Sequence, residues 1–121
     1  MSKHDAPTPD NLRRWVGDVE DALTACLRSF ARYLRATNKA PATIRGYLGA
    51  GVLLADWLRG SADRPDEFAE VTHEHLVDFF TELFSRGHSP SSVADRYRSL
   101  QQLYRSLYVV EEDIEIGRAH V

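Results

Sequence analysis

Two short stretches decide the fold of this chain: Lys39-Ala-Pro-Ala-Thr43-Ile-Arg45-Gly-Tyr47 and Gly87-His-Ser-Pro-Ser-Ser92-Val93. Each is a polar turn whose Pro, Ser or Thr favours a helix start, and each is followed by an apolar run at helical spacing. Helix N-termini leave backbone N–H groups without partners and carry partial positive charge, which suits phosphate groups. Two such starts, about fifty residues apart, predict two helix N-termini that work together.

The apolar spacing around these stretches predicts an all-α protein, a compact four- to five-helix orthogonal bundle. A short leading segment carries Leu12, Trp15 and Val16, and helices follow over roughly 20–36 and 42–59, the latter opening near Thr43. Two more helices follow, one from a Thr72 cap to Gly87 and one from Ser89-Pro90. The inward-facing residues expected on these two helices are Leu76, Phe79, Phe80, Leu83, Phe84, Val93, Tyr97, Leu100, Leu103, Tyr104 and Leu107.

The chain of 121 residues is long enough for one domain with one core. We expect residues 1–20 to form an N-terminal arm and short leading helix, 21–110 the helical domain, and 111–121 an acidic tail. The net charge of −3 is unevenly distributed, because residues 28–60 carry +5 and 83–110 carry +3, whereas 61–82 carry −6. Both basic segments include one of the predicted helix starts, which indicates an anion-binding face.

Three glycines within the 42–59 helix are unusual, because each costs about 1 kcal/mol relative to Ala. Gly51 falls on the core side and permits close helix packing. Gly46 and Gly49 fall on the outer side beside Arg45. Two interpretations stay open for this pair: a weak or locally bent helix, or a surface cleared of bulk for another backbone.

Little in the sequence supports catalysis. His73 and His75 are two residues apart and so point to different sides of a helix, which favours a polar first turn over a metal site. The serines at 91 and 92 have no evident His-carboxylate partner. We expect no cofactor, no metal and no membrane segment, and the single cysteine, Cys26, fits a reduced, cytoplasmic protein.

The order of motifs resembles the N-terminal core-binding domain of tyrosine recombinases, the phage integrase family. The matching features are Pro-x-Thr43-Ile-Arg45-x-Tyr47, Trp57-Leu58, Val71-Thr72, Phe79-Phe80, Gly87-His-Ser and Leu103-Tyr104-x-x-Leu107. They cover roughly residues 22–110. The resemblance implies a SAM-like helical bundle that forms half of a clamp around duplex DNA. Asp95 and Gln101 stand where the family often has basic residues, which lowers the positive charge of the last helix.

The resemblance also implies which residues meet DNA, on the helices that open at Thr43 and Ser91. The candidate contacts are Lys39, Thr43, Arg45, His88, Ser91, Ser92, Arg98 and Gln102, with Arg96 and Arg105 as flanking candidates. Ser and Thr hydroxyls and backbone N–H groups position phosphates, whereas Arg and Gln also reach base edges.

We therefore expect the DNA-binding module of a site-specific recombinase, acting in DNA integration or recombination catalysed by a separate domain. The chain ends where that domain begins in the family, so it is expected to be the non-enzymatic half, and none of its tyrosines is taken as the nucleophile. Its expected partners are double-stranded DNA, the parent protein's C-terminal catalytic domain and other recombinase protomers. The alternative is a helical protein-interaction module without DNA binding, docking through Leu12, Trp15 and Val16.

Overall fold

The computed structural model describes residues 6–16 and 20–119, with side chains described up to Leu107. Over these residues every regular element is a helix, which confirms the predicted all-α bundle. The elements are α1 (Leu12–Val16), α2 (Ala22–Ala36), α3 (Pro41–Arg59), the 3₁₀ turn η1 (Phe68–Glu70), α4 (His73–Ser85) and α5 (Pro90–Ala119). The predicted break between the leading helix and α2 falls on residues 17–19, outside the described residues.

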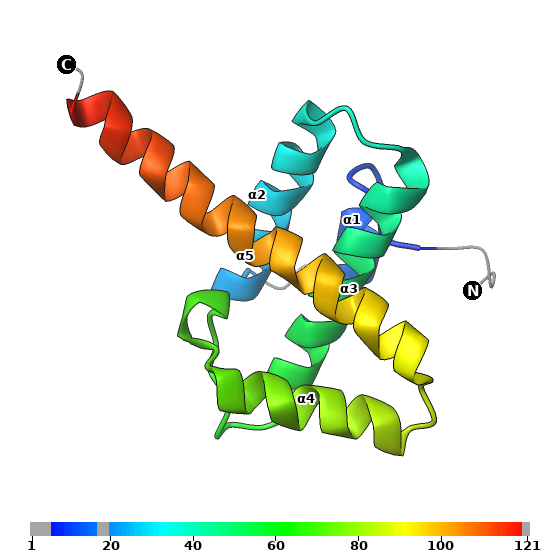
Figure 1. The fold of residues 1–121 in the computed structure, drawn as a ribbon. Helices are drawn as coiled ribbons and strands as arrows, with labels where there is room; N and C mark the ends of the chain where they lie inside the picture. Colours follow the sequence, from blue (N-terminus) through cyan, green and yellow to red (C-terminus); the bar gives the residue numbers. More distant parts are fainter. Residues whose placement is uncertain (1–5, 17–19, 120–121) are drawn as a thin grey trace.

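The arrangement of the helices is dominated by α5, which crosses α3 near the middle of both helices (Figure 1). α2 packs against both α3 and α5, α4 packs against α5, and α1 packs against α2. The last turns of α5 project away from the other helices (Figure 1). No helix in the described part of the chain is both long and apolar enough to cross a membrane.

Close packing between α2 and α3 depends on Gly51. A Cβ atom at this position would lie 2.8 Å from Leu27 Cδ2, nearer than side-chain carbon atoms approach each other. Leu27 is fully buried, as are Leu48 and Leu54 on α3. The predicted core-side role of Gly51 is therefore confirmed, and α3 runs unbroken through all three of its unusual glycines.

Helix ends follow the local sequence closely in α4 and α5. Thr72 caps α4, because its side chain accepts a hydrogen bond from the backbone N–H of His75 at 3.3 Å. The ring of His75 in turn accepts one from the Thr72 backbone N–H at 2.9 Å, so this histidine completes a capping box. Gly87 follows the helix with φ of 92°, a left-handed conformation that favours glycine. Ser89 then caps α5 by accepting from the Ser92 backbone N–H at 3.1 Å.

The start of α3 lies slightly earlier than the sequence indicates. Pro41 is the first helical residue and Ala40 is the cap, with no capping bond from a side chain. Thr43 therefore sits inside the first turn and does not act as the cap. Proline at the first helical position presets φ in the helical range and leaves one backbone N–H fewer to be satisfied.

Two of the predicted inward-facing residues are in fact exposed. Phe84 on α4 is 48% exposed and Tyr97 on α5 is 50% exposed. The rest of the α4 and α5 stripes behave as expected, with Phe79, Leu83 and Leu103 almost fully buried. Phe84 lies in the last turn of α4, and Tyr97 contacts Phe80 on α4 yet stays half exposed, so helical spacing alone overestimates their burial.

The loop between α3 and α4 is fastened to the bundle at both ends. Arg64 lies over the Trp57 ring, with its guanidinium carbon 3.9 Å from the ring centroid. Phe68 is buried, and its carbonyl accepts a hydrogen bond from the Tyr104 hydroxyl at 2.9 Å. The loop thus covers part of the core with Phe68 and is joined to α3 through Arg64 and to α5 through Tyr104.

Candidate nucleic-acid interface

A polar stripe runs along the outer face of α5. Ser91, Arg98 and Arg105 are exposed and lie at seven-residue intervals, so the three side chains project from one side of the helix. Gln102 is half-buried beside this stripe. We call these four residues the α5 stripe. Its ends, Ser91 and Arg105, are fourteen residue steps apart, about 21 Å of helix at 1.5 Å per residue.

Arg98 in this stripe forms an ion pair with Asp95, three residues earlier on the same helix. Both side chains are about two-thirds exposed, at 65% for Arg98 and 66% for Asp95. An ion pair this exposed is weak, so the guanidinium can exchange Asp95 for another anion at small cost. Asp95 nevertheless removes local positive charge, as the sequence indicated.

Arg96 lies on the other side of α5, toward α3. Two positions along a helix differ by about 200° in direction, so Arg96 and Arg98 cannot face one surface together. The guanidinium of Arg96 instead reaches over Gly49, where a Cβ atom would lie 3.4 Å from Nη1. Arg96 and Arg45 both border a groove of about 400 Å³ that also includes Gly46 and Gly49.

This groove also carries residues that are not among the predicted DNA contacts. Pro7 and Trp15 from the N-terminal segment line it, as does Asp56 from α3. The Trp15 Nε1 atom is buried without a described hydrogen-bond partner. No sequence signal connects Pro7 or Trp15 to Arg45, because their approach depends on how the N-terminal segment folds back onto α3.

The remaining predicted contacts lie at the two helix starts. Lys39 is exposed in the turn before α3, whereas Thr43 is half-buried and points away from Arg45. His88 is half-buried in the α4–α5 turn, where its backbone N–H donates to the Leu83 carbonyl at 3.1 Å. Ser92 is exposed, and its hydroxyl accepts from Ser89 at 3.2 Å.

The structure therefore divides the ten predicted residues into separate groups. The first turns of α3 and α5 lie on the same side of the view in Figure 1 but at separate corners, because the helices cross. The structure brings Arg45 and Arg96 together across the α3–α5 crossing, and it aligns Ser91, Arg98, Gln102 and Arg105 along α5.

Comparison with protein families identifies this architecture. Residues 26–115 match the family described as phage integrase, N-terminal SAM-like domain. The chain belongs to this family. The matched residues include all of α3 and α4 and both groups of predicted contacts, which gives this SAM-like domain a recombinase-related role. Comparisons with curated proteins and with solved structures found no match.

The family match covers only part of the described helices. It begins inside α2, so α1 and the segment before it precede the matched residues. It ends inside α5, which continues as a helix to Ala119 through the acidic stretch expected to be a tail. The division of the chain at residues 20 and 110 stays a prediction.

Proposed function

We propose that this SAM-like domain binds double-stranded DNA through α3 and α5. Its role is to hold a recombination half-site for a separate catalytic domain of a tyrosine recombinase. The observation that carries the proposal is the α5 stripe, where exposed Ser91, Arg98 and Arg105 share one side of a helix in a phage integrase domain.

The chemistry of the stripe suits a DNA groove. A single helix fits the major groove of B-DNA, and arginine donates to phosphates as well as to the acceptor atoms of guanine. Serine at the first turn of α5 adds a hydroxyl donor where backbone N–H groups also point outward. Arg45 and Arg96 form a separate positive group beside Gly46 and Gly49, on the side of α5 that faces α3.

The absence of bulk at Gly46 supports a close approach to α3. A Cβ atom there would meet nothing within 4 Å, so the protein interior does not require glycine at this position. Because α3 is continuous across residues 41–59, Gly46 does not break the helix either. Of the two interpretations that the sequence left open, we favour a surface cleared for a DNA backbone.

The test is a fluorescence-anisotropy titration of a labelled duplex at several salt concentrations. We expect Arg98→Ala with Arg105→Ala to weaken binding and to lower the slope of log affinity against log salt by about 1.8, or 0.9 per phosphate contact. Arg86→Ala is the matched control, because Arg86 is 62% exposed and also pairs with an acidic residue on its own helix. If the double variant and the control lose the same binding affinity per charge removed, a role for the α5 stripe is contradicted.

A second candidate function is contact with protein, either the catalytic domain or another recombinase protomer. Leu12 and Val16, which were expected to dock on a neighbour, are buried against the chain's own α2. The exposed apolar side chains lie elsewhere: Val77 and Phe84 share a face of α4, and Tyr97 contacts Phe80 on that face with ring centroids 5.9 Å apart. Phe84→Ser should leave half-site binding intact and reduce assembly of protomers on a full recombination site, as measured by native gel shift.

A further inference from the structure

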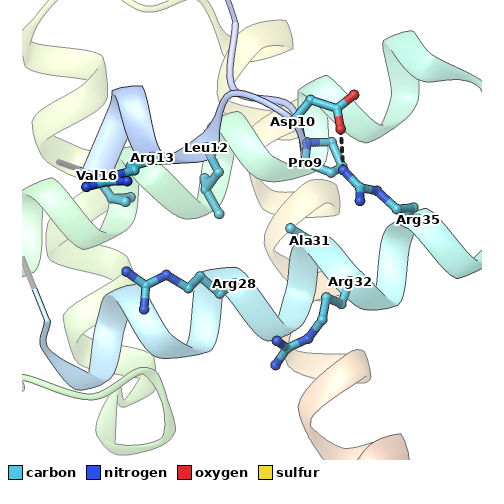
Figure 2. Close-up of a pocket in the computed structure, with 9 residues that line it drawn as sticks. All are labelled: Pro9, Asp10, Leu12, Arg13, Val16, Arg28, Ala31, Arg32 and Arg35. Carbon is cyan, nitrogen blue, oxygen red and sulfur yellow. Dashed lines mark hydrogen bonds and ion pairs between the residues drawn. The ribbon is translucent and has the colours of Figure 1, made fainter. Parts of the chain in front are cut away.

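A second positively charged groove lies between α1 and α2, away from all ten predicted DNA contacts (Figure 2). It has a volume of about 280 Å³ and carries four arginines: Arg13 from α1 and Arg28, Arg32 and Arg35 from α2. Figure 2 shows Arg13 and Arg28 on opposite sides of the gap between the two helices, and Arg35 extended toward Asp10. We call this feature the arginine groove.

The spacing of these arginines indicates a linear ligand. Arg28, Arg32 and Arg35 are four and three residues apart, so they form one stripe on α2 about 10 Å long. One small anion contacts one or two guanidinium groups, whereas a chain of phosphates contacts successive ones. Each strand of a duplex carries a charge every 3.4 Å of helix axis, which supplies several phosphates over the length of this stripe.

Two carboxylates already pair with arginines of this groove: Asp10, which lines it, and Glu20, which lies outside its lining. Arg28 donates two hydrogen bonds to Glu20, at 2.9 Å and 2.6 Å, in the paired geometry that guanidinium also forms with phosphate. Arg35 forms an ion pair with Asp10, whose side chain is 89% exposed. Exposed pairs of this kind contribute little stability, so an incoming polyanion can displace the carboxylates. The contact described for Arg32 is with the Ser29 hydroxyl at 3.4 Å, which leaves its charge without an acidic partner there.

The arginine groove also depends on structure outside the family match. Arg13 and the buried Leu12 come from α1, which precedes residues 26–115. Leu12 packs against α2 beside Ala31, so α1 supplies one wall of the groove and α2 the other. A SAM-like domain that began at the matched residues would present the α2 arginines on an open helix face with no opposite wall.

We propose that the arginine groove binds the phosphodiester backbone of a nucleic-acid strand. It is a second nucleic-acid surface, in addition to the surface proposed on α3 and α5. Arg28, Arg32 and Arg35 contact successive phosphates, and Asp10 and Glu20 hold two of these arginines in place when the groove is empty. Because the bonds involve phosphate alone, binding here is independent of base sequence. One domain thereby contacts two segments of nucleic acid.

The experiment uses the full chain and a short labelled duplex, with binding stoichiometry and salt dependence as readouts. Arg32→Ala with Arg35→Ala should reduce the number of duplexes bound per protein from two to one and lower the salt slope by about 1.8. Asp10→Asn, which releases Arg35, should instead strengthen binding. These residues are exposed, so circular dichroism melts should be unchanged, and Arg86→Ala, which removes one exposed positive charge, serves as the control for the effect per charge removed.

The outcomes separate this proposal from the one for α3 and α5. If Arg32→Ala with Arg35→Ala has no effect while Arg98→Ala with Arg105→Ala abolishes binding, the arginine groove is not a nucleic-acid surface. The reverse pattern supports the groove and overturns the α5 stripe. Competition experiments identify the ligand, with unlabelled duplex, millimolar inorganic phosphate, a mononucleotide and polyglutamate as competitors. If any of the last three displaces the labelled duplex as readily as unlabelled duplex does, a backbone-binding role is overturned.

Discussion

The carboxylate of Asp21 joins the start of α2 to the end of α3 through Arg59. It accepts hydrogen bonds from Arg59 Nε at 2.9 Å and Nη2 at 3.0 Å, and it caps α2 by accepting from the Thr24 backbone N–H at 2.8 Å. Arg59 also donates to the hydroxyl of the fully buried Thr24 at 2.9 Å. One carboxylate thus satisfies a helix terminus and fixes the relative position of two helices that pack on one core.

Asp21→Ala should destabilise the domain by about 2 kcal/mol, because it removes a helix cap together with a charge-assisted bond. Asp21→Asn is the matched variant: it keeps a capping side chain and loses only the charge, so about half of the loss is expected. Urea denaturation followed by circular dichroism measures both. An Asp21→Ala protein within 0.5 kcal/mol of the parent would show that this link contributes nothing to stability.

The same link should make stability dependent on pH. The hydrogen bond from Arg59 lowers the pKa of Asp21 well below its ordinary value, so the folded state holds the ionised carboxylate more strongly than the unfolded state does. The resulting stabilisation is complete above the unfolded pKa, near pH 4, and is lost as the pH falls toward the folded pKa. Unfolding free energies measured between pH 6 and pH 2 should fall less steeply for Asp21→Asn than for the parent.

Local signals in the sequence predict most of this fold. Thr72, Gly87 and Pro90 act through capping and backbone restriction, which need only neighbouring residues, and the helices they bound are found where expected. Contacts between residues far apart in the chain are not predicted by such local signals. The contact between Asp21 and Arg59 joins residues 38 positions apart, and nothing in either neighbourhood indicates it. The exposure of Tyr97 likewise depends on how α4 packs against α5, where its ring contacts Phe80.

The candidate site was predictable only in part, for the same reason. Residue types and charge segregation pointed to α3 and α5, but a list of basic residues does not say which share a face. Helical periodicity separates Arg96 from Arg98, and that much follows from spacing. The approach of Arg96 to Gly49, and so to Arg45, follows from the helix crossing, which only the structure provides.

Two glycines of α3 should respond in opposite directions to the same substitution. Gly51→Ala places a methyl group 2.8 Å from Leu27 Cδ2 in the closed core, so we expect a loss of about 1–3 kcal/mol from overpacking. Gly46→Ala adds a methyl group with nothing within 4 Å, so helix propensity should raise stability by up to about 1 kcal/mol. Thermal melts of both variants test the pair.

Gly46→Ala has a second expected effect, on DNA. If a DNA backbone approaches α3 at this position, the added methyl group weakens binding in a variant that is more stable than its parent. A gain in both stability and affinity would indicate that Gly46 serves no close contact and that it is simply an unfavourable residue in the helix.

Asp95→Asn should strengthen DNA binding. The substitution removes the acidic partner of Arg98 and leaves the guanidinium on the exposed face of α5 available to phosphate. An exposed ion pair of this kind contributes about 0.6 kcal/mol. Because phosphate no longer competes with Asp95 for Arg98, we expect about a threefold gain in affinity at low salt. Asp78→Asn, on the exposed face of α4, changes the net charge equally and is the control. A larger gain from Asp78→Asn would mean that overall charge governs binding, and the α5 stripe would lose its assigned role.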